Sequence, residues 1–222
     1  EYTAMDYFVA ANELMIPEFT QRGIPENKIL ATGIPIAPKF AHSMDKCEAR
    51  TALGLNQDVF TVLLAAGGMG FSGMIPVMEE IDHLEDMQLV AVCGSNTRLK
   101  NKLKGMEFKN PVHVLGFVDN MEQYLDAADV VVTKPGGLST SEAIGKCKPM
   151  VLMKPMPGVE NMNLAFLLNN SLAVHSNQYQ PVGQVLSQLR LNDIKMKEME
   201  RAQKKWGKKH SAKTLAEFIE KL

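Results

Sequence analysis

Short apolar runs of strand length alternate with segments of helical periodicity along most of this 222-residue chain. The strand-like runs cover residues 7–11, 28–32, 59–65, 88–93, 112–115, 130–133, 150–153 and 172–174. The helical segments cover residues 13–22, 46–53, 75–84, 97–103, 121–127, 139–145 and 161–169, and only helices follow, at 182–189, 193–206 and 212–222. Strands separated by helices of roughly 8–12 residues form a parallel sheet through right-handed crossovers. We therefore predict an α/β fold, a Rossmann-like doubly wound parallel sheet.

A proline-rich join divides the chain near its start. Two prolines, Pro35 and Pro38, follow Gly33 closely and cannot continue a helix or a central strand. We expect residues 1–36 to be a strand–helix–strand remnant of a neighbouring domain with its linker, and residues 37–222 to be the main domain with C-terminal helices. The first residues have neither an initiator Met nor a signal-peptide pattern, so we interpret the chain as a piece of a longer protein.

The net charge and its distribution along the chain limit the kinds of partner that the protein is expected to bind. A formal net charge of −1 gives no general case for nucleic-acid binding. Residues 195–222 carry nine basic and four acidic side chains; this tail is either a solvated helix face or a weak dock on an anionic membrane surface. We expect a cytoplasmic protein, with an association at the inner face of the cell membrane as the alternative that the tail suggests.

The cysteines and histidines indicate structural roles. Cys47, Cys93 and Cys147 form no CxxC pair and each has apolar neighbours, so we expect buried free thiols in a reducing compartment. The five histidines are scattered, without a second ligand at metal spacing, and we predict no metal site.

The stretch 129–142 carries the strongest functional signal. A β-branched run stops at a Lys-Pro-Gly-Gly turn, and a helix follows that begins with hydroxyl residues, Ser139 among them. Gly136 and Gly137 allow close backbone approach to a ligand, and a helix N-terminus attracts anions such as phosphate. Glu142, one turn further, is placed to accept hydrogen bonds from a ribose diol. The alternative is an ordinary strand–turn–helix whose start is capped by Ser139, Thr140 and Ser141.

Three other loops follow predicted strands, where an open parallel sheet binds its ligands. The loop 66–73 has four glycines, which would admit a diphosphate near Gly68, Met69 and Gly70 or form a tight turn without a ligand. In the segment 116–121, Phe117 and Val118 suit a flat base, or else a hydrophobic staple before an N-cap.

The loop 154–163 is stiffened by two prolines and a glycine. Its polar residues suit hydrogen bonding to sugar hydroxyls, with helix capping by Glu160 or Asn161 as the alternative. The candidates for the sugar are Glu160, Asn161 and Asn163.

Taken in order along the chain, these motifs resemble a known family. They are Thr-Gly-Ile-Pro at 32–35, the glycine loop, Gly-Phe-Val-Asp at 116–119, Lys-Pro-Gly-Gly-Leu-Ser-Thr-Ser-Glu-Ala at 134–143 and Pro-Gly-Val-Glu-Asn-Met-Asn at 157–163. Together they resemble the C-terminal, donor-binding half of a GT-B glycosyltransferase. The similarity is greatest to the group of processive diacylglycerol glucosyltransferases and monogalactosyldiacylglycerol synthases, which is related to the peptidoglycan UDP-GlcNAc transferase.

The resemblance implies roles for individual positions. It assigns the donor diphosphate to the helix start at Gly136, Gly137, Leu138 and Ser139, the ribose to Glu142 and the uracil to the backbone of Val118. It assigns the hexose to Val159 and Glu160, the positions at which the family has a Gln-Glu pair. Val159 offers no amide, which affects hexose identity. Relatives commonly have Arg where this chain has Ala37, so a cation near the diphosphate is missing.

From this resemblance we expect inverting hexosyl transfer from UDP-glucose or UDP-galactose to diacylglycerol, without a cofactor. No Asp-x-Asp triplet is present, in keeping with metal independence. The general base is expected in an N-terminal acceptor domain, so we expect this chain to bind UDP but to transfer no sugar by itself. The alternatives are a peptidoglycan-type UDP-GlcNAc transferase, and a UDP-sugar epimerase or nucleotide-binding module.

Overall fold

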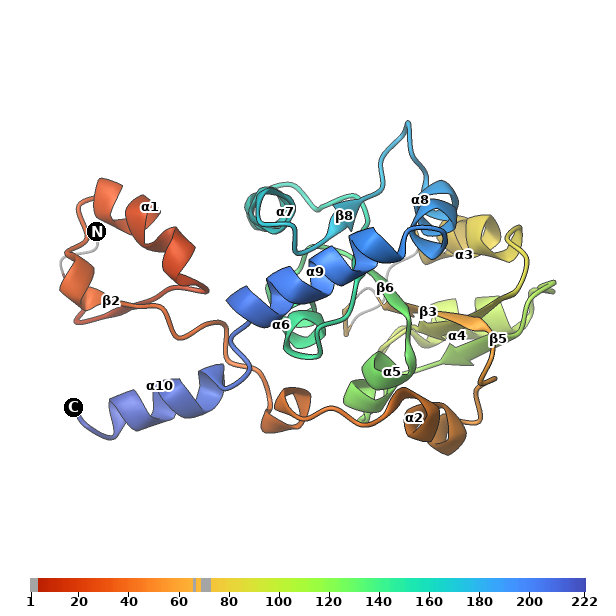
Figure 1. Cartoon of the computed structure of the whole chain (residues 1–222), viewed down its shortest axis with the longest axis horizontal. Coiled ribbons are helices and arrows are strands. Elements are labelled where there is room, and N and C mark those ends of the chain that lie inside the picture. The colour runs from red at the N-terminus through yellow and green to blue at the C-terminus, as the bar shows by residue number, and fades with distance from the viewer. Residues whose placement is uncertain (1–3, 66, 69–72) are drawn as a thin grey trace.

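The main body of the protein is a parallel sheet covered by helices on both faces (Figure 1). The computed structural model describes residues 4–65, 67–68 and 73–222. Six strands form this sheet in the order β5-β4-β3-β6-β7-β8. They are β3 (Phe60–Ala65), β4 (Met87–Val92), β5 (Val112–Leu115), β6 (Val130–Thr133), β7 (Met150–Leu152) and β8 (Val174–His175). The predicted doubly wound α/β fold is confirmed.

Alternate side chains of each strand enter two different cores. On β3, Leu64 belongs to a core closed by α3 (Met74–Asp82), α4 (Thr97–Lys104), α8 (Val182–Arg190) and Met199 of α9 (Asp193–Trp206). Its neighbour Leu63 enters a second core closed by α2 (Lys46–Leu53), α5 (Met121–Ala127), α6 (Gly137–Gly145) and α7 (Val159–Asn169). Burial on both faces is the reason that these strands read as continuous apolar runs rather than as alternating ones.

Strand order reverses between β3 and β6. The chain runs outward through β4 and β5, then returns so that β6 pairs with β3 on its other side, with Leu63 opposite Val131. The helices that follow these strands, α3 and α6, therefore lie on opposite faces of the sheet, and a crevice opens at the carboxyl ends of β3 and β6, where doubly wound sheets bind ligands. Gly94, after β4, has a positive φ of 57°, and a side chain there would collide with the carbonyl of Gly68.

A small second unit is formed by the first residues. It consists of β1 (Phe8–Val9), a 3₁₀ turn η1 (Glu13–Met15), α1 (Ile16–Gln21), a second 3₁₀ turn η2 (Glu26–Lys28) and β2 (Ile29–Leu30). β1 and β2 pair in parallel around an apolar cluster centred on Ala10, Ile24 and Ile29. The assignment of residues 1–36 to a neighbouring domain stays a prediction.

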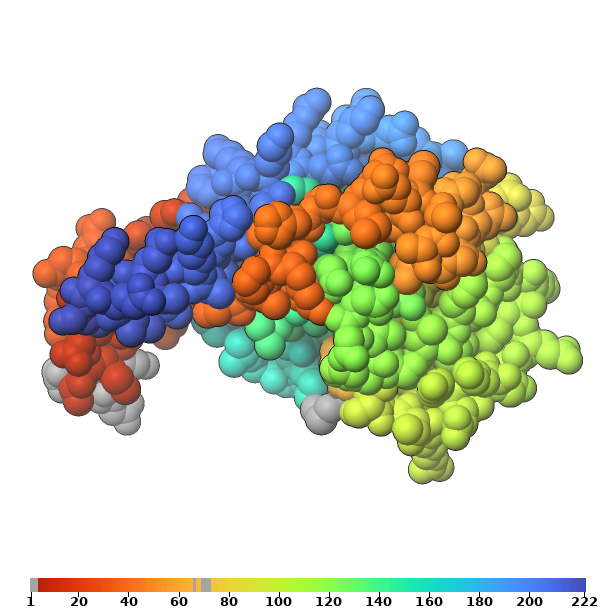
Figure 2. All heavy atoms as spheres, turned by 90° about the horizontal axis from the view of Figure 1, so that it is seen from below, coloured from red at the N-terminus to blue at the C-terminus, as the bar shows by residue number. Residues whose placement is uncertain are grey.

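The last helix, α10 (Ser211–Ile219), crosses back to the N-terminal unit (Figure 1). Figure 2 shows the blue C-terminal segment lying along the red N-terminal one. The ring of Phe218 meets that of Tyr7 edge-on, with centroids 4.9 Å apart. At the crossing point the buried hydroxyl of Ser211 donates to the carbonyl of Ile34 (2.8 Å) and accepts from the amide of Ile36 (3.3 Å). Ser211 thus joins the C-terminal crossover to the linker between the two units.

A buried ion pair connects α5 with the end of α6. The ammonium of Lys146 lies 2.5 Å from the carboxylate of Asp126, and both side chains are almost fully buried. The same carboxylate accepts from the amide of Met44 (3.1 Å), and Lys146 also donates to the carbonyl of His42. The pair therefore fixes the segment that leads into α2 against both helices.

The sequence-based boundaries differ from the structure at a few places. The predicted helix 13–22 is divided into η1 and α1, because Pro17 at the start of α1 lacks an amide proton. A short 3₁₀ helix, η3 (Pro38–Ala41), follows the linker and was not predicted. Helices α6 and α7 each begin two residues earlier than predicted. The expectation that all three cysteines are buried holds for Cys93 alone: Cys47 is exposed in the first turn of α2, and Cys147 is partly exposed.

Candidate functional site

A large cavity of about 890 Å³ opens at the point where the strand order reverses. Its walls come from five parts of the chain: residues 34–40, residues 63–65 with 67–68, residues 92–94, residues 117–125 and residues 131–142. Of the candidate residues, the structure brings together here Gly68, Phe117, Val118, Gly136, Gly137, Leu138, Ser139 and Glu142. Met69 and Gly70 lie outside the described residues. We call this space the larger cavity.

The first turn of α6 forms one wall of the larger cavity. Gly136 is the N-cap residue, with an extended backbone, and no described side chain caps the helix. The alternative that Ser139, Thr140 and Ser141 cap this start is wrong: the Thr140 hydroxyl donates to the carbonyl of Gly136 (2.7 Å) instead. A helix start without a side-chain cap keeps the amide protons and the positive end of the dipole for another partner.

The two glycines of this turn leave room on different sides. A methyl group at Gly136 would meet no atom within 4 Å, so its cavity side is open. One at Gly137 would lie 3.0 Å from the Cδ1 atom of Ile34, so Gly137 allows the linker to pack closely against the helix. Gly136 therefore leaves space for a ligand, and Gly137 allows Ile34 to pack against the helix behind that space.

Thr133, the last residue of β6, lines the larger cavity as well. Its side chain is 1% exposed, and its hydroxyl has no hydrogen-bond partner among the described residues. An unpaired buried hydroxyl costs free energy, which a ligand in the cavity would recover. Thr133 was not among the residues selected from the sequence, although its position directly before the Lys-Pro-Gly-Gly turn could have indicated it.

Glu142 reaches the larger cavity from the second turn of α6. Burial raises the pKa of its carboxyl group, and the positive charge of Lys39 acts in the opposite direction. Lys39 lies in η3, where its ammonium is 3.0 Å from the carboxylate of Glu122 and donates to the carbonyl of Asp119. Lys39 was not selected from the sequence, but it supplies a cation two positions after Ala37.

Phe117 and Val118 form an apolar edge of the larger cavity. The side chain of Phe117 is 70% exposed, whereas Val118 packs against the core below. Asn120 occupies the N-cap position of α5, but its side chain donates to Gln123 (2.9 Å) rather than capping the helix. The exposed ring is therefore available as a platform for a flat group.

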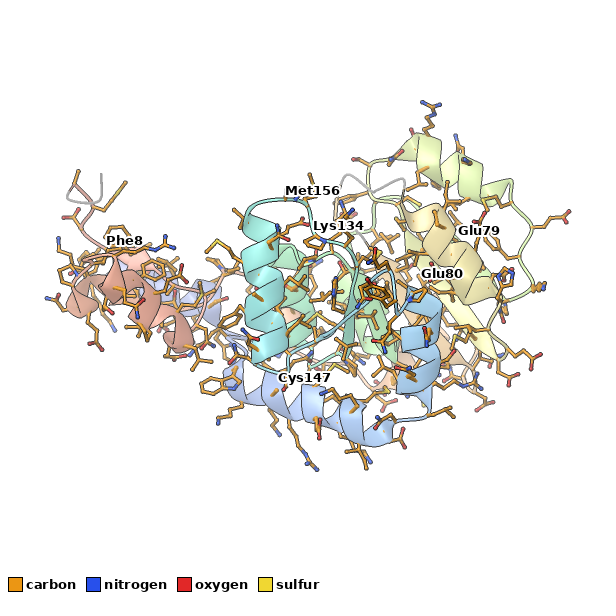
Figure 3. The ribbon with its side chains drawn as sticks, turned by 90° about the horizontal axis from the view of Figure 1, so that it is seen from above. Phe8, Glu79, Glu80, Lys134, Cys147 and Met156 are labelled. Carbon is orange, nitrogen blue, oxygen red and sulfur yellow. The ribbon has the colours of Figure 1, made fainter. Side chains whose placement is uncertain are left out.

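The loop 154–163 lies beside the larger cavity rather than in its wall. The carboxylate of Glu160 accepts from the amide of Met156 in its own loop (2.6 Å), and Asn161 is exposed. Asn163 donates to the carbonyl of Pro135 (2.9 Å), which ties this loop to the Lys-Pro-Gly-Gly turn. Figure 3 shows Met156 and Lys134 on these two neighbouring loops. A role of Glu160, Asn161 and Asn163 in sugar binding stays a prediction.

The described part of the chain has neither a metal-binding cluster nor a membrane-spanning helix. Within residues 4–65, 67–68 and 73–222, no three His, Cys, Asp or Glu side chains come together as a metal cluster. No helix in this described part of the chain has the length and hydropathy needed to cross a bilayer.

Known protein sequences are similar to this chain over most of its length. Residues 61–217 match the profile of the glycosyltransferase family 28 C-terminal domain. A processive diacylglycerol beta-glucosyltransferase of Bacillus licheniformis is 30% identical over 200 residues, which are 89% of this chain and 52% of the relative. The enzyme of the same name from Staphylococcus saprophyticus is 37% identical over 164 residues, 72% of this chain and 41% of the relative. The chain thus spans about half the length of these curated relatives.

Several solved structures have a fold similar to that of this chain. The Anabaena protein HepE in complex with UDP and glucose superposes with a TM-score of 0.64 at 16% identity, covering 98% of this chain and 63% of HepE. MurG of Acinetobacter baumannii gives a TM-score of 0.61 at 17% identity, covering 88% of this chain and 58% of MurG. A UDP-N-acetylglucosamine 2-epimerase described as putative, from Listeria monocytogenes, reaches 0.67 at 19% identity, with 96% and 59% covered. At these identities the likeness concerns the fold alone.

Proposed function

Because this chain belongs to the glycosyltransferase family 28 C-terminal domains, we propose that it binds a UDP-sugar for hexosyl transfer to diacylglycerol. The observation that carries this proposal is the start of α6, which faces the larger cavity without a side-chain cap while Glu142 lines the same space. UDP-glucose is the favoured donor and UDP-galactose the alternative, because the curated relatives are named as glucosyltransferases.

The diphosphate of the donor would lie at the first turn of α6. The backbone amides there and the helix dipole attract phosphate, and the open side of Gly136 allows it to approach. The unpaired hydroxyl of Thr133 is a further donor at the floor of the same space. In transfer, these groups would stabilise the charge that develops on the leaving UDP.

The nucleoside would extend from the diphosphate towards Glu142 and Phe117. An ionised carboxylate accepts two hydrogen bonds, which suits the vicinal hydroxyls of ribose. Uracil would stack on or beside Phe117 and contact the backbone of Val118, both of which line the larger cavity. Phosphate, ribose and base would thus each contact a different part of the cavity wall between Gly136 and Phe117.

Transfer also requires a base that accepts the proton of the acceptor hydroxyl. Its location in a separate acceptor domain stays the expectation from the resemblance. Within this chain, the proposal covers donor binding and stabilisation of the leaving group.

Calorimetric titration of the chain tests the proposal. We expect UDP and UDP-glucose to bind with one-site isotherms, and ADP to bind more weakly because the proposal assigns uracil, and not a purine, to the backbone of Val118. A tighter isotherm for UDP-GlcNAc than for UDP-glucose would favour the peptidoglycan-type alternative. Absence of binding by all three uridine nucleotides would refute the proposal.

A further inference from the structure

A smaller cavity of about 230 Å³ lies next to the larger one. It is enclosed by the N-terminal unit, α6, α7 and the end of α9. Ile34 and Gly137 line both cavities, so the two spaces share a wall at the first turn of α6. A ligand in the smaller cavity would therefore lie beside the proposed position of the donor diphosphate.

The walls of the smaller cavity are mainly apolar. The apolar side chains include Met15, Phe166 and Trp206, with Val159 and Met162 at the rim, where they are 72% and 53% exposed. Methionine side chains adapt to irregular apolar ligands because they are unbranched and flexible. An exposed apolar rim leads from the protein surface into this space.

Several polar residues in these walls already have partners. Asn12 donates to the carbonyl of Trp206 (2.8 Å) and accepts from the amide of Leu14 (3.0 Å). Glu18 pairs with Arg22 (2.6 Å), and Lys208 pairs with Glu13. Asn163 is bonded to Pro135. These interactions engage the amide and charged side chains of the lining, so the remaining surface, which is mainly apolar, suits an apolar occupant rather than a charged one.

We propose that the smaller cavity binds an alkyl chain of the lipid acceptor. This inference rests on the proposed function, because a diacylglycerol whose hydroxyl reaches the donor must place its chains within a short distance of α6. A dry apolar cavity of about 150 Å³ is large enough to bind benzene. At about 230 Å³, the smaller cavity accommodates a longer chain segment, and the open rim lets the rest of the chain leave.

Trp206 makes the inference directly measurable. It is the only tryptophan of the chain and it lines the smaller cavity. Diacylglycerol with bromine on a short acyl chain, presented in mixed detergent micelles, should quench Trp206 fluorescence in a saturable manner.

A pair of methionine variants separates specific binding from contact with the micelle. Met162→Asp places a charge at the rim of the smaller cavity, and quenching should weaken at least ten-fold. Met156→Asp is the matched control, because Met156 is similarly exposed (57%) and lines neither cavity. UDP affinity should be unchanged in both variants. Equal quenching of both variants and the unmodified chain, or absence of quenching, would overturn the alkyl site.

The two proposals fail in different ways. If UDP binds but brominated diacylglycerol does not quench Trp206, the alkyl site is refuted and the donor site remains. If Trp206 is quenched in a Met162-dependent manner but UDP does not bind, the donor function is refuted and an apolar site for lipid chains remains.

Discussion

The positive charge of Lys39 acts on the carboxylate of Glu142 within the larger cavity, against the effect of burial. Burial alone disfavours the ionised form of a carboxyl group, whereas a nearby cation favours it. Lys39 is held in place by Glu122 and by the carbonyl of Asp119. The charge of Lys39 thus offsets part of the effect of burial on the pKa of Glu142, and it favours the ionised form that hydrogen bonding to a ribose diol requires.

Removal of the Glu142 carboxylate should weaken donor binding. Glu142→Ala deletes charge-assisted hydrogen bonds, so we expect a loss of about 1.5–3 kcal/mol in the free energy of UDP binding. Calorimetry measures this loss directly. Glu48→Ala, on the exposed face of α2, is the control and should bind UDP normally. Unchanged affinity of Glu142→Ala would remove Glu142 from the site.

Donor affinity should depend on pH through the same carboxyl group. Because the ionised form binds the ribose, affinity should fall as the pH is lowered through the raised pKa of Glu142. In Lys39→Met the opposing charge is absent, so the midpoint of this fall should move to higher pH. UDP-glucose is the ligand to titrate, since it lacks a terminal phosphate that ionises near pH 6. A Glu142→Gln protein should lack this transition, and a midpoint that stays in place without Lys39 would contradict the coupling.

Glu142 should also lower the stability of the ligand-free protein. Its folded-state pKa lies above the usual value of 4.5, so the unfolded state releases its proton at lower pH. The free energy of unfolding should therefore decrease as pH rises through that window, and the penalty persists at neutral pH. Glu142→Gln removes this penalty, and urea denaturation at pH 7 should show a more stable protein. At pH 4 the difference between the two proteins should become smaller; a constant difference would indicate another cause.

Gly136→Ala should weaken UDP binding with little effect on the stability of the fold. The added methyl group meets no protein atom and the φ of −77° suits alanine. The lower flexibility of the unfolded chain offsets the weaker N-cap preference of alanine, so stability should change by less than about 0.5 kcal/mol. The methyl group points into space needed by the diphosphate, and UDP affinity should fall at least ten-fold. Gly105→Ala, after α4, is the control with ordinary contacts; normal UDP binding by Gly136→Ala would place the diphosphate elsewhere.

The buried pair of Asp126 and Lys146 should be sensitive to loss of one partner. Lys146→Met leaves the carboxylate of Asp126 without its cation, which should reduce the free energy of unfolding by about 3–5 kcal/mol. Urea denaturation measures the reduction. The double variant Asp126→Leu with Lys146→Met removes both charges and should be more stable than Lys146→Met alone. A double variant that is less stable than either single one would show that the pair has a net stabilising role.

The features that the sequence predicted correctly are local ones. The β-branched run at 130–133 had to be a buried strand, and the glycines after it indicated the turn into α6. The doubly wound topology followed from the alternation of such runs with helices. The candidate residues Gly136 to Ser139 and Glu142 line one cavity because they occupy one strand–turn–helix segment.

The features that the sequence did not predict depend on distant contacts. Lys39 approaches Asp119, which is 80 residues away in sequence, so no local pattern indicates it. The smaller cavity depends on Asn12 meeting Trp206, 194 residues later. Periodicity and spacing describe neighbours along the chain and contain no information on these encounters.

The bridge from Ser211 to Ile34 and Ile36 has a mechanical consequence. The polypeptide passes between the two units twice, once through the linker and once through the C-terminal crossover, and the side chain of Ser211 connects the two passages by hydrogen bonds. Any rotation of one unit against the other must therefore turn both passages as a common hinge. Since Ile34 also lines both cavities, such a rotation would change the widths of the two cavities together.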